Sequence, residues 1–344
     1  MNRLTERQKF VLTLVIHEYI RTAVPVGSKL LVEHYNLSMS SATVRNEMAQ
    51  LTDMGYLRQP HTSAGRAPTE EGYRYFVKQL LRETQLPIET RRMIIHQFYQ
   101  THHDIDEWMR LAASTLAYQS RAAALVTAPH PEQILLKHLE LIATRGHQVL
   151  MVMVMVGGEI NQRIITLDEP LSQEQLSATA ARINQLFQGK GASHLVTVGD
   201  QLSALEKEIV QWLVQDLQQI SSVAAGDIFL DGITNVLAEP EFSGSAEARR
   251  ALRVLEERPL LQELLARTVL AEAPSGVQVL IGGEGTRDEL RQCSLVLARY
   301  GAPGLASGTL GVLGPMRMSY GRTISTVRFM ANLLSDLIAD TLVE

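Results

Sequence analysis

Apolar residues recur with helical spacing in the segment that follows Ser40. Val44, Met48 and Leu51 lie at positions i, i+4 and i+7 and form a single stripe suited to packing. Ser40 or Ser41 stands before this stripe, where a serine caps a helix N-terminus. The opposite face is small or polar. The pattern predicts a helix that packs through the stripe and presents polar side chains to a partner.

A shorter helix is expected just before it, over residues 28–35, with Leu30 and Leu31 facing inward. A three-residue polar turn at positions 36–38, anchored by Leu37, joins the two helices. After the second helix, Gly55 can adopt the left-handed conformation that ends a helix. Residues 56–59 are typical of a short strand, and residues 61–66 of its turn. This order of elements predicts a winged helix-turn-helix.

The polar face of the second helix and the hairpin turn carry the residue types that contact DNA. Small hydroxyl residues allow close approach to a major groove, and Arg and Asn can bond base edges or phosphates. Two packed core helices are the alternative explanation of a bare helix-turn-helix pattern, but the polar face and the Arg-bearing hairpin favour DNA binding. The expected DNA-binding residues are Ser40, Ser41, Thr43, Arg45, Asn46, Gln50, His61, Thr62, Ser63 and Arg66.

Strand patterns dominate beyond residue 122. Residues 123–127, 136–142, 149–156 and 160–167 predict an antiparallel meander, in which Met151, Met153 and Met155 share one core-facing side. Amphipathic helices are expected over residues 171–188 and 202–221, and a further helix over 245–268. Strands at 277–281, 293–298 and 309–313 precede a terminal helix over 320–342. The expected fold class is α+β.

Four segments carry a family resemblance. PVGSKLL, SSATVRNEMAQLTDMGYL and QPHTSAGRAPTEEGYRYFV resemble the N-terminal domain of the HrcA family, the heat-inducible transcription repressors of bacteria. GTLGVLGPMRMSYGRTISTV resembles the C-terminal signature of that family. The resemblance implies a winged helix-turn-helix followed by a GAF-like mixed domain with an inserted dimerisation segment. We place these parts at residues 1–86, at 87–168 with 226–344, and at 169–225.

The resemblance also implies a function. It indicates a homodimer that binds a CIRCE-type inverted-repeat operator on double-stranded DNA ahead of chaperone operons, with the chaperonin GroEL assisting folding to the active form. The alternative is a ligand-responsive regulator whose GAF-like domain binds a small molecule. The residues expected to line its interior, Leu125, Met153, Val279 and Leu297, are all apolar, which favours a filled core.

Charge is distributed unevenly along the 344-residue chain, whose net charge is −5. Residues 1–85 hold 11 basic and 8 acidic side chains, a balance of +3, whereas the remainder holds 21 against 29, a balance of −8. The phosphate backbone responds to local potential, so the basic N-terminal end is expected to dock on DNA and the acidic remainder to stay away.

No pattern for catalysis, a metal or a cofactor stands out. The run at residues 102–107 contains adjacent histidines, which cannot point at one metal from a single helix face. The glycines at 282–285 lack the Lys-Ser/Thr of a phosphate loop. The single cysteine, Cys293, excludes a disulfide framework within the chain and fits a reducing cytoplasm. The longest apolar run, residues 149–156, is too short for a membrane span.

Overall fold

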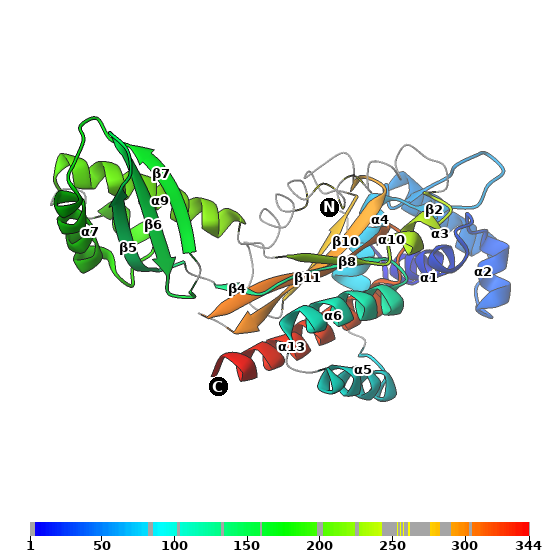
Figure 1. Cartoon of the computed structure of the whole chain (residues 1–344). Helices are drawn as coiled ribbons and strands as arrows, with labels where there is room; N and C mark the ends of the chain where they lie inside the picture. The colour runs from blue at the N-terminus through cyan, green and yellow to red at the C-terminus, as the bar shows by residue number, and fades with distance from the viewer. Residues whose placement is uncertain are drawn as a thin grey trace. The chain divides into compact units, whose positions relative to one another are not determined.

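The computed structural model is an α+β protein in which helices pack against antiparallel sheets (Figure 1). It describes residues 4–81, 85–101, 104–131, 134–158, 160–197, 202–223, 227–242, 276–282, 290–302 and 305–343, together with Arg253, Leu255, Glu257 and Leu261. The chain divides into two compact units. The first comprises Met1–Ala128, Asp227–Gly301 and Gly308–Glu344, and the second comprises Pro129–Gly226 and Ala302–Ser307.

The first unit begins with three helices, a small hairpin and a fourth helix that continues into a π-helix, which together we call the N-terminal region (residues 4–81). Its elements are α1 (Glu6–Thr22), α2 (Ser28–His34), α3 (Ser41–Asp53), β1 (Leu57–Arg58), β2 (Ala67–Pro68), α4 (Glu70–Tyr75) and the π-helix η1 (Phe76–Leu80). Thr5 and Gln8 form a capping box at the start of α1, and Ser40 caps α3. Gly55 has a φ of +83°, the left-handed conformation expected after α3.

The three helices enclose a small core. Val44, Met48 and Leu51 of α3 are buried, as the stripe predicted. Leu31 is the buried residue of α2, whereas Leu30 is 44% exposed. The expectation that both leucines face inward was therefore wrong, because neighbouring positions on a helix differ by about 100° and α2 has only seven residues with which to cover the core.

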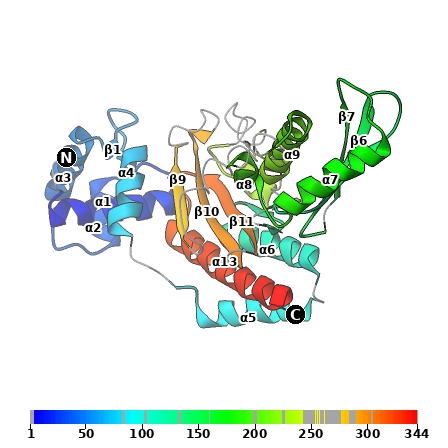
Figure 2. The ribbon, with the colours of Figure 1, turned by 90° about the vertical axis from the view of Figure 1, so that its left-hand side faces the viewer.

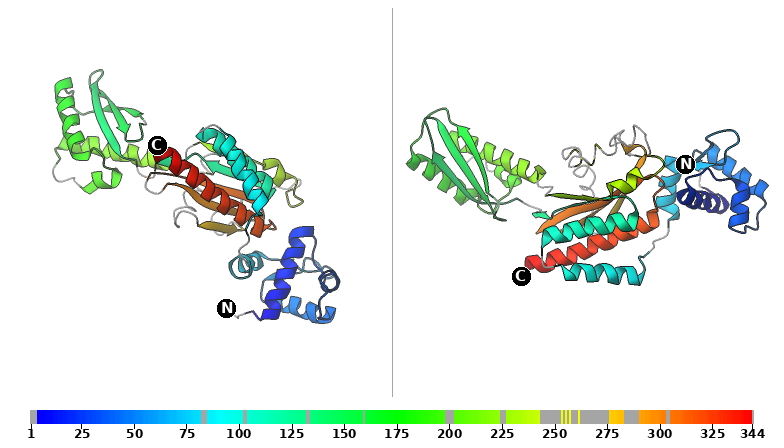
Figure 3. Two further views of the ribbon diagram at one scale, coloured as in Figure 1. Left: turned by 90° about the horizontal axis from the view of Figure 1, so that it is seen from below. Right: turned by 45° about the vertical axis from the view of Figure 1, so that its right-hand side comes forward.

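A six-stranded sheet, most of whose residues belong to the first unit, follows the N-terminal region together with the helices that pack on it. Its order is β8 (Ile228–Asp231), β3 (Ala123–Thr127), β11 (Ala306–Pro315), β10 (Cys293–Ala302) and β9 (Val277–Ile281), and β4 (His130–Pro131) pairs with β11. Figures 2 and 3 show α6 (Ile105–Ser120) and α13 (Tyr320–Val343) side by side along this sheet, with α5 (Ile88–Gln100) next to α6.

Both faces of this sheet are covered at its central strands, which explains why β3, β10 and β11 are largely buried and apolar. Ala124 and Val126 belong to the core that includes α6 and α13, whereas Ala123 and Leu125 pack with Val236 of α10 (Ile233–Leu237) on the other face. A strand buried on both sides loses the alternation of a half-exposed strand and becomes a continuous hydrophobic run.

The second unit contains a three-stranded meander and three helices. The strands are β5 (Leu136–Ala143), β6 (Gln148–Met155) and β7 (Ile160–Thr166), and the helices are α7 (Gln173–Phe187), α8 (Ala192–Thr197) and α9 (Ala204–Val223). Met151, Met153 and Met155 are buried, which confirms their expected core face. Asn184 of α7 accepts from the backbone N–H of Leu139 at 2.7 Å and donates to its carbonyl at 2.8 Å. This amide holds α7 against the edge strand β5.

The limits of the second unit differ from the insert expected at residues 169–225. The meander pairs only within itself and shares a core with α7 and α9, so the inserted unit begins near residue 129. The four residues expected to line the interior of the GAF-like domain also lie in different hydrophobic clusters. Leu125 and Leu297 lie in one cluster, Met153 lies in the core of the second unit, and Val279 packs against the cluster that the sheet shares with the N-terminal helices. Apart from Arg253, Leu255, Glu257 and Leu261, the helix expected over 245–268 lies outside the described residues, as do the histidines at 102–103 and the glycines at 283 and 285.

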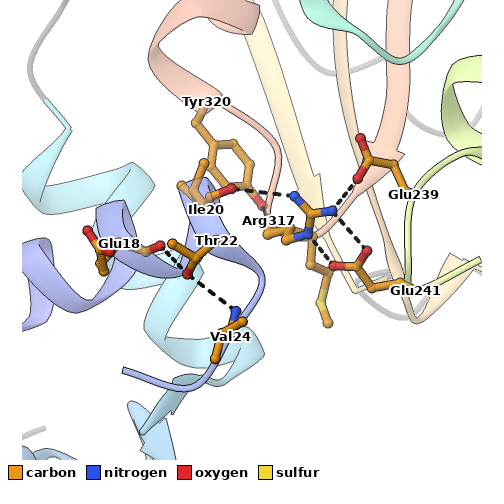
Figure 4. A network of polar contacts seen from close by, with 9 residues as sticks. Glu18, Ile20, Thr22, Val24, Glu239, Glu241, Arg317 and Tyr320 are labelled. Carbon is orange, nitrogen blue, oxygen red and sulfur yellow. Dashed lines mark hydrogen bonds and ion pairs between the residues drawn. The ribbon is translucent and has the colours of Figure 1, made fainter. Parts of the chain in front are cut away.

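Contacts across the first unit join the N-terminal region to the six-stranded sheet (Figure 4). The guanidinium of Arg317, only 13% exposed, pairs with Glu239 and Glu241 and donates to the carbonyl of Ile20 at 3.4 Å. From α4, Arg74 donates to the carbonyl of Ile281 at 3.2 Å. The two regions also share one continuous hydrophobic cluster. The position of α1 is thus fixed by the sheet.

The buried carboxylate of Glu18 should make stability depend on pH. A hydrogen bond from Arg21 lowers the pKa of Glu18 in spite of burial, which acts in the opposite direction, and Tyr35 also donates to it at 3.2 Å. Because the folded-state pKa lies below the unfolded one, this stabilisation is present above about pH 4.3 and is lost as pH falls through the folded pKa. We expect Glu18→Gln to lose about 1–3 kcal/mol at neutral pH.

Thermal unfolding of both proteins across pH 7 to 3 measures this effect. The melting temperatures of Glu18→Gln and the parent should converge at the acid end. A constant difference over the whole range would show that charge at Glu18 does not contribute. Glu33→Gln, at an exposed position of α2, is the matched control and should behave as the parent does.

Candidate nucleic-acid interface

The outward side of α3 carries a compact set of exposed residues. With Val44, Met48 and Leu51 committed to the core, the helix exposes two rows with i, i+4 spacing, one of Ser41 and Arg45 and one of Ala42, Asn46 and Gln50. We call these five residues the exposed α3 surface. They bring together short side chains at the helix start with longer hydrogen-bonding ones a turn later.

The two long polar side chains in the middle of this surface have no partner within the described part of the chain. Arg45 and Asn46 are exposed and form no hydrogen bond or ion pair with any residue described. Their donors and acceptors are therefore available to an external ligand. An Arg and an Asn at adjacent positions of an exposed helix face are the residue types that make bidentate contacts with guanine and adenine.

Ser40 and Thr43 are already engaged at the start of α3. The Ser40 hydroxyl accepts from the backbone N–H of Thr43 at 3.1 Å, and the two hydroxyl oxygens lie 2.9 Å apart. Both were expected DNA-binding residues. In the structure Ser40 is the N-cap of α3 and Thr43 is its partner; Ser40 is exposed and Thr43 is half-buried.

Contacts from α1 fix the polar residues at the border of this surface. Glu47, the acidic residue nearest to Arg45 and Asn46, lies 3.6 Å from the guanidinium of Arg7, which offsets its negative charge. The amide of Gln8 donates to the side-chain oxygen of Gln50 at 2.8 Å. The helix behind α3 therefore controls both the charge and the orientation of side chains at its exposed edge.

The hairpin after α3 has an ordered polar tip. His61, Thr62 and Ser63 are exposed, as expected for a surface that meets a ligand. Gln59 donates from its side-chain amide to the carbonyls of Thr62 and Ala64, at 2.9 and 3.1 Å. Residues 57–68 contain two arginines and no acidic residue, so the hairpin is basic.

Arg66 lies at the base of this hairpin and not at its tip. Its backbone forms an isolated bridge with Val26, with both N–H to carbonyl distances at 2.8 Å. A Cβ atom on Gly65 would lie 2.3 Å from the Val26 carbonyl oxygen, so only glycine allows this approach. The side chain of Arg66 is half-buried, and its Nε is buried without a hydrogen-bond partner among the described residues.

Sequence reasoning missed Arg58. It is exposed on β1 while its neighbour Leu57 is buried, and it pairs with Ala67 across the hairpin. The signal was present, because residues alternate between the two faces of a strand and an apolar residue at 57 directs the arginine at 58 outward. Arg58 therefore joins Arg45 as an exposed arginine of the N-terminal region.

The described residues give little support for a catalytic cysteine, a metal site or a membrane-spanning helix. Burial raises the pKa of the Cys293 thiol to about 12, so it stays protonated and is a poor nucleophile. Within the described ranges, no three His, Cys, Asp or Glu side chains are grouped so as to hold a metal ion. None of the helices searched over those ranges has the length and apolarity needed to span a membrane.

Comparison with known proteins identifies the family. The model of the HrcA protein C terminal domain matches residues 106–324. The heat-inducible transcription repressors HrcA from Roseiflexus castenholzii and Herpetosiphon aurantiacus are 43% and 42% identical to this chain. Each alignment covers 98% of this chain, together with 95% of the Roseiflexus protein and 96% of the Herpetosiphon protein. A crystal structure of a hypothetical protein shares the fold at a TM-score of 0.60, with 22% identity over 98% of this chain and all of that one. The chain therefore belongs to the HrcA family, which consists of heat-inducible transcription repressors and not of enzymes.

Proposed function

We propose that this chain represses heat-shock chaperone operons by binding a CIRCE-type inverted repeat in double-stranded DNA as a homodimer. The observation that carries the proposal is the exposed α3 surface, where Arg45 and Asn46 are free of partners within the described chain. Family membership supplies the repressor activity. The geometry adds the residues through which DNA would be recognised.

On this proposal the N-terminal region is a winged helix-turn-helix. Helix α3 lies in the major groove, where Ser41 permits close approach and Arg45 and Asn46 bond base edges. The hairpin tip, His61 to Ser63, lies along the adjacent backbone or minor groove. The six-stranded sheet with α6 and α13 corresponds to the GAF-like domain.

The ligand-responsive alternative has no specific observation in its favour. It requires one interior shared by the GAF-like domain, yet the residues expected to line it belong to separate clusters. Those clusters also contain buried side chains from both covered faces of the sheet, such as Val126 and Leu297. A filled core fits these positions better than a ligand site does.

Dimerisation through the second unit is supported by an apolar face of its sheet. The helices of the segment expected to dimerise, α7 and α9, use their apolar residues inside the unit: Ile209, Leu213 and Leu217 are buried in its own core. The sheet face opposite Met151 and Met153 instead leaves Ile160 69% and Ile164 62% exposed. An exposed apolar sheet face of this kind marks a protein contact, and a two-fold pair would match an inverted repeat.

The chaperonin GroEL is a proposed partner, on family grounds and on the topology of the first unit. That unit is assembled from three chain segments separated by the second unit. The Tyr300 hydroxyl donates to the Thr127 carbonyl across 173 residues of sequence. Structures that depend on such distant pairings fold slowly and expose apolar surface meanwhile, which makes them suitable chaperonin clients.

Replacing Arg45 with Ala should weaken operator binding by about 1–3 kcal/mol, because a bidentate contact with guanine would be lost. Titration of the full chain against operator and scrambled duplex measures the loss. Arg92→Ala, which removes an exposed arginine from α5, is the control and should leave affinity unchanged. An equal loss on both duplexes would make Arg45 a phosphate contact and refute base readout.

Replacing Arg66 with Ala should weaken binding to all duplexes and lower the slope of log affinity against log salt by roughly one unit. The reason is that a basic hairpin on the phosphate backbone releases counterions without reading sequence. Thermal unfolding of the same variant checks that the Val26 bridge survives. An unchanged slope with intact stability would remove Arg66 from the interface.

The double variant Ile160→Lys with Ile164→Lys should convert the dimer to a monomer, because two charges would have to be buried in the apolar contact. Sedimentation velocity measures the change, and operator affinity should fall with it. Ile88→Lys, at a residue 60% exposed on α5, is the matched control. A double variant that stays dimeric would show that this sheet face does not pair the subunits.

A further inference from the structure

The orientation of Gln8 on α1 is fixed by the backbone. Its side chain is buried, and its Oε1 accepts from the N–H of Thr5 at 3.0 Å, while the Thr5 hydroxyl accepts from the N–H of Gln8 at 3.2 Å. A backbone N–H only donates, so the amide atom that meets it must be the oxygen. The nitrogen of Gln8 is therefore the atom that points toward α3.

This orientation passes to Gln50 on the exposed α3 surface. The Gln8 amide nitrogen donates to Oε1 of Gln50 at 2.8 Å. Since that nitrogen has no acceptor capacity, the Gln50 atom bonded to it must be the oxygen. The NH₂ group of Gln50 remains for a ligand, and Gln50 is exposed in the same row as Asn46. A backbone N–H on α1 thus determines which group α3 presents.

We propose that Gln50 acts in DNA recognition as an oriented donor, contacting a hydrogen-bond acceptor of the duplex through its NH₂ group. This rests on the proposed function. A glutamine that reads adenine needs both its oxygen for N6 and its nitrogen for N7, and here the oxygen is turned toward Gln8. The acceptors available are a phosphate oxygen or a major-groove base acceptor, namely O6 or N7 of guanine, N7 of adenine or O4 of thymine.

Gln8→Glu reverses this orientation without removing the helix cap. Glutamate is the usual partner of Thr at this position of a capping box, so the Thr5 N–H keeps its acceptor. A carboxylate only accepts, so Gln50 would have to turn its NH₂ group inward and present its oxygen to DNA. Oxygen facing an acceptor is repulsive, and binding should weaken.

A cycle of four full-length proteins tests the proposal: the parent, Gln8→Glu, Gln50→Ala and the double variant. The probe is a duplex carrying the inverted repeat upstream of the chaperone operon in the chain's own genome. We expect Gln50→Ala to weaken binding roughly three- to tenfold, as loss of one hydrogen bond does. Gln8→Glu should weaken it at least as much, and should have little effect once Gln50 is Ala.

The cycle separates orientation from the charge that Gln8→Glu adds. An equal effect of Gln8→Glu in both backgrounds would mean that charge alone acts, and would overturn the proposal. If Gln8→Glu lowers the melting temperature, Gln8→Met replaces it. That variant frees Gln50 to turn either way and should weaken binding less than Gln50→Ala does; an equal loss would also overturn the proposal.

Substituted duplexes distinguish the two acceptors. If the loss in Gln50→Ala disappears when one G·C pair is replaced, or when its guanine is 7-deazaguanine, the acceptor is that base. If the loss is the same on every duplex, the acceptor is a phosphate. A loss that disappears when one adenine is replaced with purine, which lacks the N6 amino group, would mean that the Gln50 oxygen accepts from DNA, and would contradict the oriented-donor proposal. A parent protein that fails to prefer the repeat over scrambled DNA would instead refute the proposed function, and the proposal with it.

Discussion

The hydrophobic core shared by the N-terminal helices and one face of the six-stranded sheet is the constraint on which the first unit depends. That core continues from Val15 and Leu51 to Val126 and Val312. Arg317 strengthens the junction, because its nearly buried charge is matched by two glutamates and its guanidinium reaches the carbonyl of Ile20 (Figure 4). Ile20 lies in the last turn of α1, where carbonyls lack partners within the helix and favour a cation.

This junction gives a physical reason for the C-terminal signature. Arg317 and Tyr320 both lie in the segment that resembles the family pattern, and both face the N-terminal region: Arg317 meets α1, and the ring of Tyr320 lies 5.9 Å from that of Tyr73 on α4. The signature therefore holds the two parts of the first unit together. Gly311 of the same segment serves packing within the sheet, since a Cβ there would lie 2.8 Å from the Val296 carbonyl oxygen of β10.

The elements of the N-terminal region could be predicted because their signals lie within a few neighbouring residues. The arrangement of the other elements could not, because it depends on contacts between residues far apart in the sequence. A cap, a helical stripe and Gly55 define α3 and the hairpin within a few residues of sequence, so their positions agreed with expectation. The meander was recognised as strands but its packing with α7 and α9 was not, because alternation reveals a strand and not its partner. The same limit hid the contacts Gln8–Gln50 and Ile20–Arg317, which join residues 42 and 297 positions apart. No periodic pattern encodes such pairs.

The exposed α3 surface is defined as much by the contacts its neighbours make as by its own residues. Ser40 and Thr43 bond each other, Glu47 is matched by Arg7, and Gln50 is turned by Gln8. Within the described chain these contacts leave the side chains of Arg45 and Asn46 without a hydrogen bond or ion pair. A side chain already held by a neighbour loses little conformational entropy on binding, whereas a free one loses more but keeps its full hydrogen-bonding capacity. The helix thus combines one preoriented contact with two adaptable ones, an arrangement that suits a surface required to fit DNA closely and still discriminate between sequences.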